Sequence, residues 1–213
     1  MSGGISLQDG IAELVGRGIN LAPDTGRRLA DYLGLLQKWN QVYNLTAVRD
    51  ADRMVTHHLL DSLAVLPHLE ARLVTRLLDV GSGAGLPGIP LALARPEWRV
   101  TVLDSNHKKG AFLHQAVAEL GVPNVEVVIT RVETFAPPAP YEVVISRAFS
   151  DLSTFAEATA RLVAPGGRLV AMKGVFPHEE VDQVPSTVRV TDTCRIAVPG
   201  LPAERHLVVL EPA

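Results

Sequence analysis

Hydrophobic positions in the first third of the chain recur every three or four residues, which is the period of an amphipathic helix. The pattern is clearest just after Asp24, where one stripe carries Leu29, Tyr32, Leu33, Leu36, Trp39 and Tyr43. It predicts a helix over 24–43, a shorter helix over 7–15 and a further helical stretch over 52–71. We therefore expect residues 1–72 to form a helical cap.

From about residue 73 the pattern changes to short apolar runs that alternate with helical segments. The runs predict strands at 76–80, 99–104, 125–130, 143–146 and 168–172, and the segments between them predict helices at 89–94, 108–120 and 152–162. Such alternation is typical of a parallel sheet covered on both faces. Two last runs, 188–198 and 206–210, are joined by a Pro-Gly-Leu-Pro turn and predict an antiparallel edge hairpin. We expect residues 73–213 to form one mostly parallel α/β domain.

Composition narrows the class of protein. The chain has 213 residues, 47% of them hydrophobic and 20% charged, which is enough to bury a core. A formal charge of −3 excludes a globally basic nucleic-acid binder but allows a local basic patch. The one cysteine, Cys194, excludes a disulfide scaffold, and no metal site is expected. Without a signal-peptide pattern or a long unbroken apolar run, we expect a cytoplasmic protein away from membranes, and nothing requires more than a monomer.

A glycine-rich loop, Asp79-Val80-Gly81-Ser82-Gly83-Ala84-Gly85, follows the first predicted strand. Glycine has no Cβ, so the backbone can turn sharply and let a ligand lie against it. Asp104 ends the next predicted strand, where an acid can accept both ribose hydroxyls of an adenosine-type ligand. The alternative is a structural turn with a surface aspartate, but strand, loop and acid together favour a nucleoside cofactor.

The spacing of the loop separates two cofactor classes. A dinucleotide fingerprint is G-x-G-x-x-G, whereas here Leu86 stands where the last glycine of that pattern would fall. The series D-x-G-x-G-x-G resembles motif I of class I S-adenosylmethionine methyltransferases, which implies a Rossmann-like fold and S-adenosylmethionine as the cofactor. Asp79 suits a hydrogen bond to an amino group or to the loop backbone. Glu133 could accept the adenine amino group or be a solvated surface acid.

Further motifs extend this resemblance to one family over about 29–210. In chain order they are Trp39-Asn40, Asn44-Leu45-Thr46, His58, Asp61-Ser62-Leu63, residues 79–90, Leu103-Asp104-Ser105, Lys109, Phe112-Leu113, Ser146-Arg147-Ala148-Phe149 and Lys173-Gly174. The series resembles the RsmG family, also called glucose-inhibited division protein B. The Leu-Pro-Gly-Ile-Pro end of the glycine loop and the Ser-Arg-Ala-Phe segment are its most specific parts.

The resemblance implies a reaction and a set of contacts. It implies methylation of N7 of a guanine, guanine 527, near the decoding centre of 16S rRNA, so that the partner is this RNA, the small ribosomal subunit or an assembly intermediate. It implies cofactor contacts at Gly81, Leu86, Val132, Glu133 and Arg147. Together with the loop and the second acid, the expected cofactor-binding residues are Asp79, Gly81, Gly83, Gly85, Leu86, Asp104, Val132, Glu133 and Arg147.

The chemistry of that reaction asks little of the protein. Guanine N7 has a lone pair and no proton, so a direct in-line transfer needs no general base and no covalent intermediate. The fourth and fifth predicted strands end in Arg147 and Lys173, which we expect to position the substrate. Arg147 suits the methionine carboxylate or guanine O6, and Lys173 suits a phosphate. For each, a salt bridge across the strand ends is the alternative. Phe149 and Trp39 are candidates to stack on a flipped guanine, although the place of Trp39 in the helix stripe favours a core position.

Three other function classes remain open. A nicotinamide-dependent oxidoreductase is disfavoured by Leu86 and by the lack of a Tyr-x-x-x-Lys pair. A non-catalytic RNA-binding or ribosome-assembly module could keep the same fold, and a small-molecule methyltransferase could keep the same cofactor. An RNA surface would need a basic patch near the site, for which the candidates are Arg49, Arg53, His57, His58, Lys108, Lys109, Arg147, Lys173 and Arg205.

Overall fold

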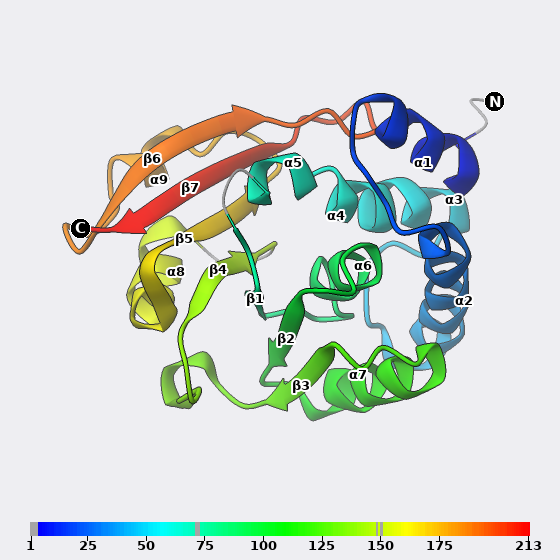
Figure 1. The fold of residues 1–213 in the computed structure, drawn as a ribbon, viewed down its shortest axis with the longest axis horizontal. Coiled ribbons are helices and arrows are strands. Elements are labelled where there is room, and N and C mark those ends of the chain that lie inside the picture. Colours follow the sequence, from blue (N-terminus) through cyan, green and yellow to red (C-terminus); the bar gives the residue numbers. More distant parts are fainter. Residues whose placement is uncertain (1–3, 71–72, 148, 150) are drawn as a thin grey trace.

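A seven-stranded sheet in the order β3-β2-β1-β4-β5-β7-β6 runs through the molecule (Figure 1). The computed structural model describes residues 4–70, 73–147, 149 and 151–213. The strands are β1 Arg76–Val80, β2 Arg99–Asp104, β3 Val125–Ile129, β4 Tyr141–Ser146, β5 Val163–Lys173, β6 Val188–Arg195 and β7 His206–Pro212. Strands β1 to β5 pair in parallel, whereas β7 pairs antiparallel with both β5 and β6. The α/β class and the edge hairpin predicted from the sequence are confirmed.

The order of the strands reverses between β1 and β4. The chain builds β1, β2 and β3 outward to one side, and then returns to place β4 and β5 on the other side of β1. Parallel sheets bind ligands at the carboxyl ends of the strands where the order reverses in this way. At this point the Ser146 hydroxyl donates a hydrogen bond to the carbonyl of Val80 over 2.8 Å, which ties the ends of the two strands together.

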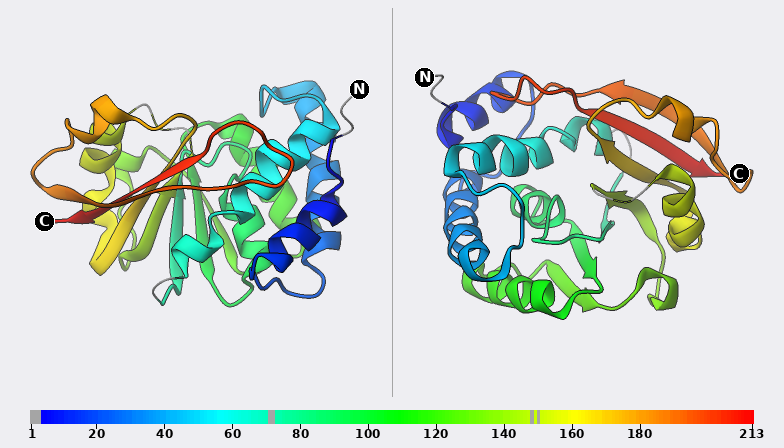
Figure 2. Two further views of the ribbon diagram at one scale, coloured as in Figure 1. Left: turned by 90° about the horizontal axis from the view of Figure 1, so that it is seen from above. Right: turned by 180° about the vertical axis from the view of Figure 1, so that it is seen from behind.

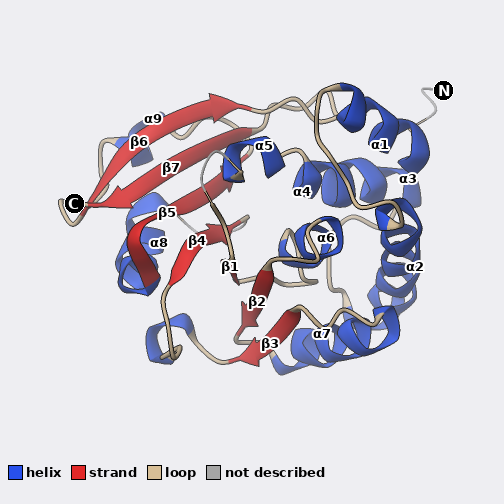
Figure 3. Cartoon of the chain, viewed as in Figure 1, coloured by secondary structure: helices blue, strands red, loops and turns tan. Residues whose placement is uncertain are grey.

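Helices cover both faces of the sheet (Figure 3). They are α1 Leu7–Gly16, α2 Thr25–Tyr43, α3 Ala51–Met54, the π-helical turn η1 Val55–Leu60, α4 Asp61–Leu63, α5 Leu66–Leu69, α6 Gly88–Ala94, α7 His107–Leu120, the 3-10 turns η2 Val132–Thr134 and η3 Ala160–Leu162, α8 Leu152–Thr159 and α9 His178–Val181. Successive strand residues face opposite sides, so Leu77 packs with the core under α2, α6 and α7, whereas Leu78 packs with the core under α8. The two termini lie at opposite ends of the molecule (Figure 2).

The first helices share a core with the sheet. The predicted stripe of α2 buries Leu29, Tyr32 and Leu36 completely. Tyr43 was expected on the same stripe, but it is 45% exposed because the helix ends there and the ring stacks on Trp39 instead. Asn40, three residues before Tyr43, is the buried residue at this end of the helix. Its side chain donates to the carbonyl of Val48 and accepts from the amide of Thr46, so it closes the loop that follows α2.

The stretch predicted as one helix over 52–71 is interrupted. It consists of α3, η1, α4 and α5, with a turn at Ala64 and Val65, and Ala71 lies outside the described residues. The wider π turn coincides with the hydroxyl of Ser62 donating to the carbonyl of His58.

The last predicted strand pair also differs, since 196–198 leave β6 where Pro199 and Gly200 begin a turn. Helix α9 was not predicted, and none of the described helices is long and apolar enough to cross a membrane.

The glycine loop offers a test of this packing through Gly85→Ala. Gly85 has φ +85°, and an added Cβ would lie 2.5 Å from Cδ1 of Ile89, so the substitution should lower the free energy of unfolding by about 1–3 kcal/mol. Gly34→Ala, in α2 with nothing within 4 Å of its added Cβ, is the control and should stabilise by up to about 1 kcal/mol. Urea unfolding measures both. Equal effects of the two variants would contradict the close packing of the loop.

Candidate functional site

The loop between β1 and α6 has a backbone that only glycine adopts readily. Gly81, Gly83 and Gly85 have φ values of 69°, 60° and 85°, all in the left-handed region. A Cβ added to Gly81 would meet nothing within 4 Å, so this part of the loop borders open space. The hydroxyl of Tyr32, from α2, donates to the carbonyl of Ala84 over 2.5 Å and holds the loop from the helical side. Leu86 is buried at the start of the turn into α6.

Asp79 lies beneath this loop and does not line a described cavity. It is completely buried, and its Oδ2 accepts a hydrogen bond from the amide of Gly88 over 2.8 Å. Among the described residues, neither its Oδ1 nor the hydroxyl of Ser82 has a hydrogen-bond partner. Burial raises the pKa of Asp79 to about 7. Of the two contacts considered from the sequence, the structure contains the one to the loop backbone.

Asp104 joins three segments at the end of β2. Its Oδ2 accepts from the amide of Gly83 over 2.9 Å, and its Oδ1 accepts from the amide of Asn106 over 2.8 Å at the start of α7. The ammonium of Lys109 lies 3.5 Å from Oδ2. One carboxylate therefore sets the position of the glycine loop relative to β2 and to the helix that follows.

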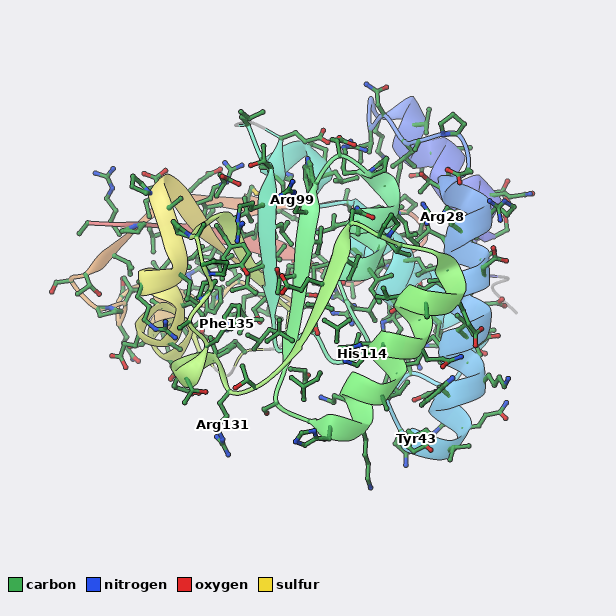
Figure 4. All side chains as sticks on the ribbon, turned by 60° about the horizontal axis from the view of Figure 1, so that its bottom comes forward. Arg28, Tyr43, Arg99, His114, Arg131 and Phe135 are labelled. Atoms are coloured by element: carbon green, nitrogen blue, oxygen red, sulfur yellow. The ribbon has the colours of Figure 1, made fainter. Side chains whose placement is uncertain are left out.

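A cavity of about 400 Å³ opens at the carboxyl ends of β1, β2 and β3. Its lining brings together residues that the sequence pattern grouped and several that it did not: Val80, Gly81, Leu103, Asp104, Ser105, Lys109, Thr130, Arg131, Val132, Glu133 and Phe149. Glu133 is exposed, whereas Val132 is buried and its carbonyl accepts from Arg161. Arg131 extends away from the ribbon at this edge (Figure 4). We name this space the first cavity.

A second cavity, of about 300 Å³, lies at the ends of β4 and β5 beside η1 and α4. It is lined by Val48, His57, His58, Asp61, Arg147, Met172, Lys173, Gly174 and Arg205. Arg147 was grouped with the cofactor residues from the sequence, but the structure places it here with Lys173. Gly83, Gly85 and Leu86 line neither cavity. The predicted site is therefore divided into two neighbouring spaces.

Arg147 is held by the helical residues. Its Nη1 donates to the carbonyl of His57 over 2.8 Å and lies 3.4 Å from Nδ1 of His58 and 3.5 Å from Oδ2 of Asp61. The charge of Arg147 opposes the rise that burial causes in the pKa of Asp79. Lys173 makes an ion pair of 2.7 Å with Glu180 of α9. Both cations therefore have ion pairs, but with acids on helices α4 and α9 and not across the strand ends as the sequence alternative had it.

His58 and Asp61, three residues apart in the helical segment, share one partner. Both contact Arg147, and Nε2 of His58 lies 2.8 Å from the hydroxyl of Thr46. Burial, with the charge of Arg147, lowers the pKa of His58 to about 4, so its ring is neutral at pH 7. Burial raises the pKa of Asp61, against the opposing effect of Arg147 and Arg205.

Arg205 was expected from the sequence on the RNA surface and Asp61 in a family motif, but neither was among the predicted cofactor-binding or catalytic residues. The Nε of Arg205 donates to Oδ1 of Asp61 over 2.9 Å, across 144 positions of the chain. A signal was available, because Arg205 directly precedes β7, whose first residue pairs with Lys173.

Phe149 lines the first cavity with its ring 5.4 Å from that of Phe155, whereas Trp39 packs against Phe112 and lines neither cavity.

Comparison with known proteins gives a consistent result. Residues 26–208 match the model of the GidB family, described as rRNA small subunit methyltransferase G. A protein of Aromatoleum aromaticum named Ribosomal RNA small subunit methyltransferase G is 55% identical over 210 residues, covering 97% of each chain. A protein of the same name from Nitrosospira multiformis is 54% identical over 220 residues, covering 100% of this chain and 99% of its own.

Solved structures share the fold at low sequence identity. The O-methyltransferase TomG from Streptomyces achromogenes, in complex with S-adenosylmethionine, has a TM-score of 0.62 at 18% identity and covers 95% of this chain and 96% of its own. The glycopeptide N-methyltransferase MtfA, complexed with S-adenosylhomocysteine, has a TM-score of 0.61 at 12% identity and covers 71% of this chain and 87% of its own. The chain thus has the class I methyltransferase fold that motif I predicted.

The raised pKa of Asp79 predicts a dependence of stability on pH. Its ordinary pKa is 3.8, so between about pH 4 and pH 7 the folded chain binds a proton that the unfolded chain has lost. The free energy of unfolding should therefore fall with rising pH in this window relative to Asp79→Asn, which keeps an oxygen for the amide of Gly88. Urea unfolding of both proteins at several pH values measures the difference. A difference that stays constant across the window would contradict a buried, proton-binding Asp79.

Proposed function

The chain belongs to the GidB family of rRNA small subunit methyltransferases G, and we propose that it transfers a methyl group from S-adenosylmethionine to N7 of a guanine in 16S rRNA. The guanine meant is guanine 527 of the decoding-centre loop, in free RNA, an assembling particle or the small subunit. The observation that carries the proposal is the family match over 26–208, combined with a glycine loop and an acid that border one cavity.

The first cavity fits the adenosine part of the cofactor. Gly81 borders it without a side chain, and the carboxylate of Asp104 faces it from the end of β2, where an acid can accept ribose hydroxyls. Val132 and Glu133 lie at its far side and would bind the adenine. The left-handed backbone of Gly83 and Gly85 would leave room for the methionine end along the loop. When bound, S-adenosylmethionine supplies a methyl group already activated by the positive charge of its sulfur.

The second cavity suits an acceptor that needs no general base. Two of the groups there that could take a proton already have partners: the ring nitrogens of His58 contact Thr46 and Arg147, and Asp61 is held by two guanidinium groups. The third, His57, is bonded through Nδ1 to the Thr56 hydroxyl and the Arg53 carbonyl. Guanine N7 has no proton to remove, so the residues need only hold the base in line and exclude water. Arg147 lies between helix and sheet, where it would bind guanine O6 or the methionine carboxylate. Phe149, the residue proposed to stack on the flipped guanine, lies in the lining of the first cavity.

Mapping of methylated nucleotides tests the proposal directly. Small subunits and 16S rRNA prepared from cells that lack this protein are incubated with the purified chain and S-adenosylmethionine, and 7-methylguanosine is located by cleavage at the modified base. We expect one modified guanine in the decoding-centre loop, and none when the protein is omitted. Cofactor binding without transfer to any RNA would favour a non-catalytic RNA-binding module. Methylation of a metabolite in the absence of RNA would favour a small-molecule methyltransferase.

A further inference from the structure

We propose that the second cavity binds a phosphate group of the RNA acceptor, and that Arg205 is a binding residue for that phosphate. The inference rests on the proposed function and adds a contact to it. Arg205 lines the cavity together with Arg147 and Lys173. It comes from the segment between β6 and β7, which makes the edge hairpin part of the RNA-binding site.

The charge around the cavity favours an anion. Three cationic side chains line it and Asp61 is the acid in that lining, while Glu180 of α9 pairs with Lys173, so these five groups leave an excess of one positive charge. Neither histidine of the lining contributes negative charge, and His58 is neutral because burial lowers its pKa. The whole chain has a formal charge of −3, so the excess of positive charge around this cavity is a local feature. Such an arrangement attracts a polyanion more strongly than a neutral metabolite.

The guanidinium groups are held in position before any ligand arrives. The side chain of Asp61 is 3% exposed and lies between them, with Oδ1 bonded to Nε of Arg205 and Oδ2 3.5 Å from Nη1 of Arg147. A guanidinium has five N–H donors, and these bonds use only some of them. One buried carboxylate shared by two arginines therefore orients both while leaving N–H groups for a phosphate, which arginine binds in a bidentate manner.

Arg205 also lies over the end of the sheet. A Cβ built on Gly174 would come within 4.0 Å of its Nη1, so the guanidinium is close to the carboxyl end of β5. Next to this point the carbonyl of Gly174 accepts from Nδ1 of His206 over 3.0 Å, and Phe176 packs edge-on against the His206 ring. Aromatic rings beside a cationic space fit a nucleotide better than an isolated ion, because bases stack on such rings.

The first experiment compares Arg205→Gln with Arg189→Gln as the matched control. Arg189 lies on the same hairpin and also has an ion pair, with Glu211, but its side chain is 69% exposed and it does not line the cavity. Filter binding of 16S rRNA is measured at several salt concentrations. We expect Arg205→Gln to raise the Kd about tenfold and to reduce the salt slope by about 1, with Arg205→Lys recovering most of the slope. The control should stay within about twofold of the unaltered chain.

Two results would overturn the inference. One is an RNA affinity of Arg205→Gln equal to that of Arg189→Gln. The other is an equal loss of S-adenosylmethionine affinity, which would assign the cavity to the cofactor. Because binding is measured and not transfer, a chain that binds RNA without methylating it would count against the proposed function alone.

A second measurement uses the unaltered chain and does not depend on the folding of a variant. Guanosine 5′-monophosphate and guanosine compete with 16S rRNA for the protein, with inorganic phosphate as a further competitor. We expect the monophosphate to compete at about tenfold lower concentration than guanosine, and inorganic phosphate to be weaker than the monophosphate. Equal competition by guanosine and its monophosphate would show that no phosphate is bound and would overturn the inference.

Discussion

The bond between the Asp104 carboxylate and the amide of Gly83 is the contact on which the arrangement of the site depends. Three left-handed glycines give the loop a sharp path, but a path of this kind needs an anchor to hold one position. Asp104 provides it at the end of β2 and also binds the first residues before α7, so loop, strand and helix start form one unit. The first cavity lies beside this unit at the strand ends, and it is the proposed binding site for the adenosine part of the cofactor.

The helical residues contribute contacts to the site as well as covering the sheet. Tyr32 bonds the glycine loop from α2, and Asp61 holds Arg147 and Arg205 from the first residue of α4. A buried carboxylate is costly unless its charge is compensated, and here two guanidiniums supply that compensation. The same ion pairs join the start of the chain, the end of β4 and the edge hairpin. In the proposed function, this cluster is where the acceptor would meet the cofactor.

Much of the fold could be predicted from the sequence because its signals are local. The runs at 76–80 and 99–104 have the observed bounds of β1 and β2, since each apolar run is closed by a charged residue or a loop. The glycine loop was recognisable from spacing alone. The contact of Asp61 with Arg205 was not, because only the completed sheet brings residues 144 positions apart together. The family resemblance grouped Arg147 with the cofactor residues, and its side chain lines the second cavity with Lys173.

We expect the loop anchored by Asp104 to bind an adenosine-type sulfonium cofactor, and a calorimetric titration measures this binding. The unaltered chain and Asp104→Ala are each titrated with S-adenosylmethionine and with NAD. The unaltered chain should bind one S-adenosylmethionine and no NAD. Asp104→Ala should bind S-adenosylmethionine at least about tenfold more weakly, as expected from losing a charge-assisted hydrogen bond. Binding of NAD, or an unchanged affinity of Asp104→Ala for S-adenosylmethionine, would contradict it.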